Sequence, residues 1–294
     1  MYIHELEYHS PQTLPELLAL LQKYGDNAKL LAGGTDLILQ MKFNRWKQEH
    51  LINLKEVSGL KQKEYQGDHF VIGCNTTLSE VLEVPEVKRD FPALWNAIHE
   101  LADWQIRNRG TVVGNICNAS PAADTSPPLL AYGAKVVIVS RASERVLPLQ
   151  DFFVGPGKTA LQTDEIVKEI RIPQPGPNTY CSFQKLGRVY DDIAIINAAV
   201  QLQVDDALQC VSAAIAMGAV GPTTRRAPKA EAILTGNRLD DQAIRAAAAQ
   251  AAEEATPITD VRASAEYRKK MVGVLVERAL RDVLQKAENN IDKR

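Results

Sequence analysis

The segment Leu30-Leu31-Ala32-Gly33-Gly34-Thr35-Asp36-Leu37 runs an apolar, strand-like stretch directly into two glycines. Because they lack a Cβ, Gly33 and Gly34 can adopt positive φ and let an anion approach the backbone closely. Successive amides can then point at one group of phosphate oxygens. The segment is therefore a candidate phosphate cradle, in which a β-branched residue at Gly34 would fill the phosphate space. An ordinary tight turn is the alternative interpretation of so short a motif.

The residues around this segment predict a small β-α-β unit of about fifty residues. A capping box with an early proline, Thr13-Leu14-Pro15-Glu16, predicts a helix that runs to Tyr24 and ends at Gly25. An edge strand is expected before it, and a strand, a helix and a second strand after it. Their expected ranges are Tyr2 to Tyr8, Lys29 to Ala32, Leu37 to Met41 and His50 to Leu54. The first turn of the Leu37 helix would hold Thr35 or Asp36, at a helix end that favours anions.

A second polar segment runs from Thr111 to Asp124 and reads Thr-Val-Val-Gly-Asn-Ile-Cys-Asn-Ala-Ser-Pro-Ala-Ala-Asp. It combines small residues, a glycine and side-chain hydrogen-bond donors with little helical or strand periodicity. This composition predicts a loop that wraps a polar ligand. Together with the paired glycines, it would provide a second set of backbone amides for the same anion.

The second half of the chain predicts an α+β layer, because strand candidates are followed by helix candidates. A proline cluster, Pro173 to Pro177, marks the domain boundary. The strands are expected at Thr179 to Leu186, Ala194 to Val204 and Cys210 to Met217, and the helices from Ala227, Asp240 and Ser264. In the last helix, the buried stripe is predicted to contain Met271, Val274, Leu275, Leu280 and Leu284.

The composition of the chain limits the kinds of partner that it can bind. The 294 residues are 45% hydrophobic and 24% charged, with a formal net charge of −2, which is typical of a folded soluble protein and gives no field for nucleic acid or anionic membrane. No apolar run approaches the ~18 residues of a membrane span, and the start lacks the pattern of a signal peptide, so a cytoplasmic location is expected. The four cysteines form no Cys-x-x-Cys pair, and the five histidines show no helical metal-ligand spacing. No metal site is therefore predicted.

The chain resembles the FAD-binding medium subunit of the molybdenum hydroxylases, the family that includes xanthine dehydrogenase and carbon monoxide dehydrogenase. The resemblance covers essentially the whole chain. It rests on four motifs in order: the glycine segment, the Thr111 segment, Asp164-Glu165-Ile166-Val167, and Phe183-Gln184-Lys185-Leu186-Gly187-Arg188. It implies an α+β fold: an FAD-binding domain of the PCMH type at 1–175, with parts at about 1–55 and 56–175, and a CO-dehydrogenase-flavoprotein-like domain at 176–294.

The resemblance implies that FAD is held by two backbone loops, since no Gly-x-Gly-x-x-Gly follows a strand as in a Rossmann fold. Val113 departs from the pattern of two glycines before the asparagine that many relatives carry, so either its side chain points away from the cofactor or the local backbone differs. Val167 would lie against the cofactor and Lys185 near the flavin ring. The implied cofactor-binding residues are Lys29, Leu30, Leu31, Ala32, Gly33, Gly34, Thr35, Asp36, Thr111, Val112, Val113, Gly114, Asn115, Ser120, Asp124, Val167 and Lys185.

The same resemblance implies a place in an electron-transfer path. A large partner chain would hold the molybdopterin cofactor, a small partner chain would hold two [2Fe-2S] clusters, and FAD on this chain would pass electrons to an acceptor. Asp191 and Ile193 would lie on the acceptor side of the flavin and favour NAD, unless Asp191 and Asp192 only form a solvated turn. Purine or another heterocycle is the preferred substrate of the complex. A free-standing FAD oxidoreductase and a non-enzymatic nucleotide-binding module are the alternatives.

Overall fold

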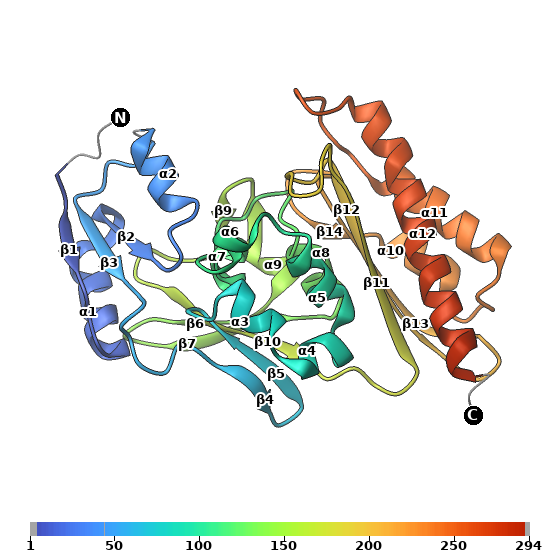
Figure 1. Ribbon diagram of the computed structural model, residues 1–294, viewed down its shortest axis with the longest axis horizontal. Helices are drawn as coiled ribbons and strands as arrows, with labels where there is room; N and C mark the ends of the chain where they lie inside the picture. The colour runs from blue at the N-terminus through green and yellow to red at the C-terminus, as the bar shows by residue number, and fades with distance from the viewer. Residues whose placement is uncertain (1–4, 44, 292–294) are drawn as a thin grey trace.

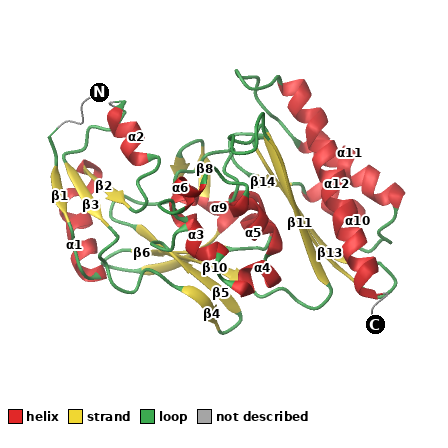
Figure 2. Ribbon diagram, viewed as in Figure 1, coloured by secondary structure: helices red, strands yellow, loops and turns green. Residues whose placement is uncertain are grey.

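The computed structural model describes residues 5–43 and 45–291 of the chain. Figure 1 shows three units side by side in chain order, with the small N-terminal sheet at one end and the long C-terminal helices at the other. The five-stranded sheet and its short helices lie between them. Figure 2 shows that the C-terminal helices are gathered on the outer side of the last sheet.

The N-terminal unit is a parallel sheet with strand order β1-β3-β2. Its strands are β1 (Glu7–His9), β2 (Ala28–Leu31) and β3 (His50–Asn53), and its helices are α1 (Leu14–Tyr24), the 3-10 turn η1 (Gly25–Asn27) and α2 (Leu37–Lys42). The predicted capping box is present, with Thr13 and Glu16 bonding each other's backbone. β1 is shorter than the strand expected from Tyr2, of which residues 2–4 lie outside the described residues. Alternation along β3 puts Ile52 in the core with α1 and Leu51 in a separate cluster with α2, so the two helices cover opposite faces.

The central unit is a sheet of order β4-β5-β10-β6-β7 in which every pairing is antiparallel. Short helices and one small hairpin cover it. The strands are β4 (Lys63–Gln66), β5 (His69–Gly73), β6 (Lys135–Val139), β7 (Glu144–Pro148) and β10 (Ile166–Pro173), with the hairpin β8 (Phe153–Gly155) and β9 (Lys158–Thr159). The helices are α3 (Leu78–Leu82), α4 (Pro85–Asp90), α5 (Pro92–His99), α6 (Trp104–Arg107), α7 (Val112–Cys117), α8 (Ser126–Ala131) and α9 (Leu149–Phe152).

The expectation that Thr111 to Asp124 is an irregular loop is wrong for its first half, which forms α7. Thr111 is the N-cap, and its hydroxyl accepts a hydrogen bond of 2.8 Å from the Gly114 amide. Val112, Val113 and Ile116 are buried, and their i, i+1, i+4 spacing is a short apolar helical face. One turn of helix is too short for periodicity to stand out between the polar residues around it.

The C-terminal unit is an antiparallel sheet of order β11-β12-β13-β14. Its strands are β11 (Thr179–Leu186), β12 (Ile196–Val204), β13 (Cys210–Gly218) and β14 (Arg225–Arg226), and its helices are α10 (Pro228–Leu234), α11 (Asp241–Glu254) and α12 (Ala265–Ile291). Alternate β12 residues face two different cores: Ala198, Val200 and Leu202 pack with these helices, whereas Ala199 belongs to the core of the first 175 residues. The predicted α+β class, with helices segregated on one face of this sheet, is confirmed.

The buried stripe of α12 differs from the predicted one. Leu275 and Leu280 are buried as expected, but Met271, Val274 and Leu284 are only partly buried. The face that packs on the sheet is shifted round the helix axis from the predicted face. It contains Arg268, Val272, Leu275, Val276, Ala279, Leu280, Val283 and Ala287. Hydrophobicity alone missed this face because it includes two alanines and an arginine, whose guanidinium is held by Asp260 and the Ile195 carbonyl.

We keep the division between residues 175 and 176 as a proposal, because β10 ends at Pro173 and β11 begins at Thr179 in a different sheet. Among the helices of residues 5–43 and 45–291, none combines the length and apolar character needed to cross a membrane.

Candidate functional site

The paired glycines lie where the chain leaves β2 and approaches the end of α6. A Cβ added to Gly33 would lie 2.1 Å from the Arg109 carbonyl oxygen and 2.8 Å from the Gly110 Cα, so only glycine permits this contact between backbones. Gly34 has a positive φ of 76°. A Cβ at Gly34 would meet the side chains of Leu31 and Ile38. The positive φ expected at Gly34 is present, and the effect of a side chain there on phosphate binding stays a prediction. Gly33 is the position where the two backbones approach closely.

Side chains on either side of this contact have different roles. In β2, Leu31 packs with α2, and the Lys29 ammonium lies 3.9 Å from the centre of the Trp46 ring, where burial lowers the Lys29 pKa. Leu30 and Ala32 pack against the large core. Thr35 is half-buried, whereas Asp36, the N-cap residue of α2, is exposed and makes no side-chain capping bond. Most of these side chains pack against the protein, so the backbone amides of the loop are the groups left to bind an anion.

Two cations lie beside the glycine loop. Arg109 comes from the segment that contacts Gly33, and Lys55 follows β3, the parallel neighbour of β2. The pKa of Lys55 is lowered by burial first and by the positive charge of Arg109 second. Two cations that repel each other would both be stabilised by an anion placed between them.

The second segment is joined to the first through Arg109 and Gly110. Gly114 follows Thr111 so closely that a Cβ there would lie 2.9 Å from the Thr111 hydroxyl. The side chains of Val112 and Val113 are buried in the core, so the Val113 side chain does point away from the loop surface. Asn115 is oriented by the Thr125 hydroxyl, which donates to its carbonyl oxygen over 2.6 Å.

A buried polar cluster links the second segment to the C-terminal sheet. The Lys185 ammonium donates to the Asp124 carboxylate over 2.7 Å and to the Glu100 carbonyl oxygen over 2.9 Å. The Asn197 amide donates to the other Asp124 oxygen over 2.8 Å. The side chains of Lys185 and Asp124 are only 3% and 7% exposed. Burial raises the Asp124 pKa, and the Lys185 ammonium opposes that rise.

Two further hydrogen bonds position this region. The Ser120 hydroxyl accepts a hydrogen bond from the Ala122 amide over 3.3 Å, and the Pro121 carbonyl oxygen accepts one from the amide of Ala219, just after β13, over 2.6 Å.

Val167 lies in β10 at a register shift opposite β6, and its side chain is buried in the large core. Contact between Val167 and a ligand would therefore go through its backbone.

The segment 187–193 is an exposed turn between β11 and β12. Asp192 pairs with Arg188 over 2.6 Å, which lowers the Asp192 pKa, whereas Asp191 is exposed beside it. The Tyr190 hydroxyl lies 3.2 Å from His99 Nδ1, and His99 precedes Glu100, whose carbonyl oxygen accepts from Lys185. The turn is thereby anchored next to the Lys185 cluster, with Asp191 and a partly exposed Ile193 on its surface.

Two family models match the chain. The FAD binding domain in molybdopterin dehydrogenase matches residues 4–175, and the CO dehydrogenase flavoprotein C-terminal domain matches residues 181–283. The chain belongs to the family of FAD-binding medium subunits of molybdenum hydroxylases. It is therefore an oxidoreductase subunit that binds FAD.

Individual relatives agree with this assignment. The chain is 34% identical to the carbon monoxide dehydrogenase medium chain of Hydrogenophaga pseudoflava, over 93% of this chain and 95% of that one. It is 32% identical to the xanthine dehydrogenase FAD-binding subunit of Escherichia coli O157:H7, over 95% and 96% respectively. A solved structure of carbon monoxide dehydrogenase from H. pseudoflava, in the form lacking the Mo-pyranopterin moiety, superposes with a TM-score of 0.93, covering 97% of this chain and 99% of that chain at 34% identity.

The residues of this FAD subunit fit the cofactor. The contact of Gly33 with the Arg109 backbone brings loops 32–36 and 109–115 together. The positive φ of Gly34 suits a loop of converging amides, and Lys55 and Arg109 give charge of the right sign for a diphosphate. At the C-terminal side, the carbonyl oxygen of the Asn197 side chain is buried without a hydrogen-bond partner, next to Lys185 and Asp124. Such an oxygen accepts a hydrogen bond from an ordered water or from a ligand.

The structure adds four residues to the candidate site that are absent from the set inferred from sequence: Lys55, Arg109, Glu100 and Asn197. An asparagine inside the apolar run Ile195-Ile196-Asn197-Ala198 is a signal that could have been read, since a buried polar residue in a strand requires a partner. The other three could not be found in this way. Lys55 and Arg109 reach the loop through tertiary folding, and Glu100 contributes only a backbone oxygen.

Proposed function

We propose that the chain is the FAD-carrying electron-transfer subunit of a molybdenum hydroxylase complex. In this proposal a small partner chain holds two [2Fe-2S] clusters and delivers electrons to the FAD, and a large partner chain holds the molybdopterin cofactor. The observation that carries the proposal is the contact of loops 32–36 and 109–115 at Gly33, together with the buried ion pair between Lys185 and Asp124, the last residue of the second segment. The medium-chain and FAD-subunit names of the relatives support it.

When bound, FAD supplies the electron-transfer chemistry, and the chain binds and orients it. We assign residues 33–36 and 111–115 to the diphosphate, through those backbone amides that the N-cap and the first turn of α7 do not use, with Lys55 and Arg109 neutralising part of its charge. Lys185 is held by Asp124 and the Glu100 carbonyl oxygen, so its ammonium is a fixed positive charge. The Asp124 carboxylate neutralises this charge, so the ammonium acts on a neighbouring group as an oriented hydrogen-bond donor. Lys185 therefore positions and tunes the flavin ring.

The first test is the purified chain itself. We expect it to be yellow, with FAD held non-covalently and released completely into the supernatant on acid precipitation. Copurification from native extract should bring down a molybdenum-containing chain and an iron–sulfur chain, which metal analysis identifies. Colour retained in the acid pellet would contradict non-covalent binding. A flavin-free chain after expression with both partners would contradict the function.

We infer that NAD accepts the electrons. Asp191 is exposed on the anchored turn, while its neighbour Asp192 is paired with Arg188. A carboxylate at this edge favours an approaching cationic nicotinamide by about 1 kcal/mol at contact distance in water. That energy corresponds to roughly a five-fold change in rate.

The acceptor test compares two oxidants in the complete complex. Asp191→Asn should slow reoxidation by NAD about five-fold and leave reoxidation by a neutral dye unchanged. Asp68→Asn, which removes an exposed charge at the β4–β5 turn, serves as the matched control and should change neither rate. Equal slowing with both oxidants, or a wild-type complex that does not react with NAD, would remove this assignment.

For the substrate we propose a purine or another nitrogen heterocycle, because relatives of this length include a xanthine dehydrogenase subunit, a caffeine dehydrogenase subunit and a nicotine 6-hydroxylase subunit. Two carbon monoxide dehydrogenase medium chains are somewhat more similar, at 34% and 33% identity, so carbon monoxide is the competing substrate. Reduction of the flavin in the purified complex by xanthine, nicotinate or carbon monoxide distinguishes these classes directly.

A further inference from the structure

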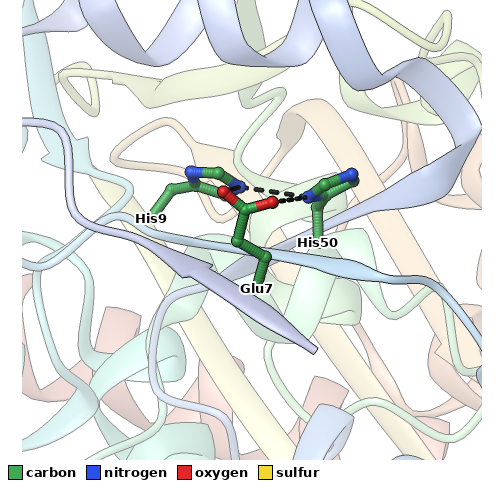
Figure 3. Close-up of side chains that lie close together, drawn as sticks. All are labelled: Glu7, His9 and His50. Atoms are coloured by element: carbon green, nitrogen blue, oxygen red, sulfur yellow. Dashed lines mark hydrogen bonds and ion pairs between the residues drawn. The ribbon is translucent and has the colours of Figure 1, made fainter. Parts of the chain in front are cut away.

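Two histidines and a glutamate that are far apart in sequence meet in the N-terminal sheet. β1 and β3 are parallel neighbours, and Glu7 is directly opposite His50. His9 follows Glu7 by two residues, so all three side chains leave the same face of the sheet. Figure 3 shows the Glu7 carboxylate and the two imidazole rings directed toward a common point. The spacing of the histidines in sequence gives no sign of this cluster.

The distances in the cluster match those between ligands of one metal ion. His9 Nε2 lies 3.1 Å from His50 Nδ1, and the Glu7 carboxylate oxygens lie 3.4 Å from His50 Nδ1 and 3.9 Å from His9 Nε2. Zinc bonds of about 2.0–2.1 Å in a tetrahedron place neighbouring ligand atoms about 3.3 Å apart. The measured separations bracket that value, so small side-chain rotations would complete the coordination.

The two rings are held in place before any ion arrives. Tyr24, at the end of α1, stacks on His50 with ring centres 3.7 Å apart and on His9 with ring centres 5.0 Å apart. The strands beneath are fixed by a hydrogen bond of 2.7 Å from the Glu7 amide to the Glu49 carbonyl oxygen. The Asn27 side chain holds Glu49 in turn, since it donates to the Glu49 carboxylate and accepts from the Glu49 amide. Rigid ligands lose little conformational freedom on binding, which favours affinity.

Exposure of the three ligands differs in a way that suits an ion with an open position. The histidine side chains are 13% and 14% exposed, whereas the Glu7 side chain is 63% exposed. The two histidine rings therefore lie on the buried side of the site, and the Glu7 carboxylate lies on its solvent side. Three protein ligands with water in the fourth position is a frequent arrangement for zinc.

We propose that Glu7, His9 and His50 form a binding site for a divalent transition-metal ion of the Zn²⁺ class. In the metal-free chain the proton shared between His9 Nε2 and His50 Nδ1 forms a hydrogen bond. On metal binding this proton moves to the outer nitrogen of its ring, and both inner nitrogens become ligands. The ion joins the three-residue edge strand β1 to β3 and so stabilises the N-terminal unit that carries the glycine loop. The site is separate from the FAD site and does not depend on the proposed function.

The test uses the full-length, tag-free chain loaded with FAD and stripped of metal with a chelator. Isothermal titration with Zn²⁺ should give one ion per chain, and Zn²⁺ should raise the thermal midpoint. His50→Gln and His9→Gln should each weaken Zn²⁺ binding at least about ten-fold and abolish the rise in the midpoint. His69→Gln is the matched control, because His69 also lies beside a carboxylate, Asp68, but outside the cluster. It should bind Zn²⁺ as the wild type does.

Flavin content and circular dichroism establish that each variant is folded. If both histidine variants unfold, Glu7→Gln decides, since Glu7 is exposed and its replacement keeps the shape of the side chain; it should also weaken Zn²⁺ binding about ten-fold. Zinc binding of equal strength in the wild type and in the folded cluster variants would overturn the proposal. So would a wild-type chain that binds no stoichiometric Zn²⁺, which would leave His9 and His50 as a hydrogen-bonded pair.

Discussion

Replacing Lys185 by methionine tests how much the buried Lys185–Asp124 ion pair contributes to the stability of the folded chain. Methionine keeps most of the apolar stem of lysine but removes the charge, so Asp124 retains only the hydrogen bond from Asn197. Both charged side chains are nearly inaccessible to water. Breaking such a pair by removing one partner costs about 3–5 kcal/mol, because a buried carboxylate is left unpaired. We expect a loss of that size in the free energy of unfolding at pH 7.

The loss should depend on pH with a definite sign. Without Lys185, the pKa of folded Asp124 rises further above its ordinary value, because burial is then opposed only by Asn197. The folded variant then holds a proton at pH values where the unfolded chain has released it. Its stability therefore falls as pH rises through that window, and the destabilisation relative to wild type shrinks at acidic pH.

Urea unfolding at two FAD concentrations is the assay, since the contribution of bound FAD grows with its concentration whereas that of the ion pair does not. Lys269→Met is the matched control. Lys269 pairs with Glu253 over 2.8 Å on the surface, so its loss should cost less than about 1 kcal/mol. A Lys185→Met variant that loses no more than this control at pH 7 would refute the assignment of Lys185 and Asp124 as a coupled buried pair.

Two further substitutions test the glycine loop. Gly33→Ala should separate the loop from Arg109 and reduce the flavin-to-protein ratio sharply, whereas Gly157→Ala, at positive φ in open space, should cost about 1 kcal/mol and leave the flavin content unchanged; equal flavin in both variants would contradict a close-approach role for Gly33. Lys55→Gln and Arg109→Gln should each weaken FAD binding by about 0.5–1 kcal/mol at low ionic strength. This difference should shrink as salt is added, and salt-independent titrations would argue against a role for these charges.

The sequence by itself determined the elements whose signals are local. The capping box at Thr13 is present, because it is completed within four residues. The long strands β11, β12 and β13 and the α+β class also follow from patterns that repeat along the chain. The resemblance to the family was likewise recoverable, since it rests on four short motifs in order.

Only the tertiary structure decided which residues meet. Gly33 needs to be glycine because of the Arg109 backbone, and the interior charge of Lys185 is tolerated because Asp124, sixty-one positions earlier, reaches it. His9 and His50 are forty-one positions apart and become neighbours only through the parallel pairing of β1 with β3. Sequence patterns record the period of a helix or a strand but not the register between distant segments. The register between two strands is fixed when many side chains are buried together, and the contacts of both candidate sites depend on that register.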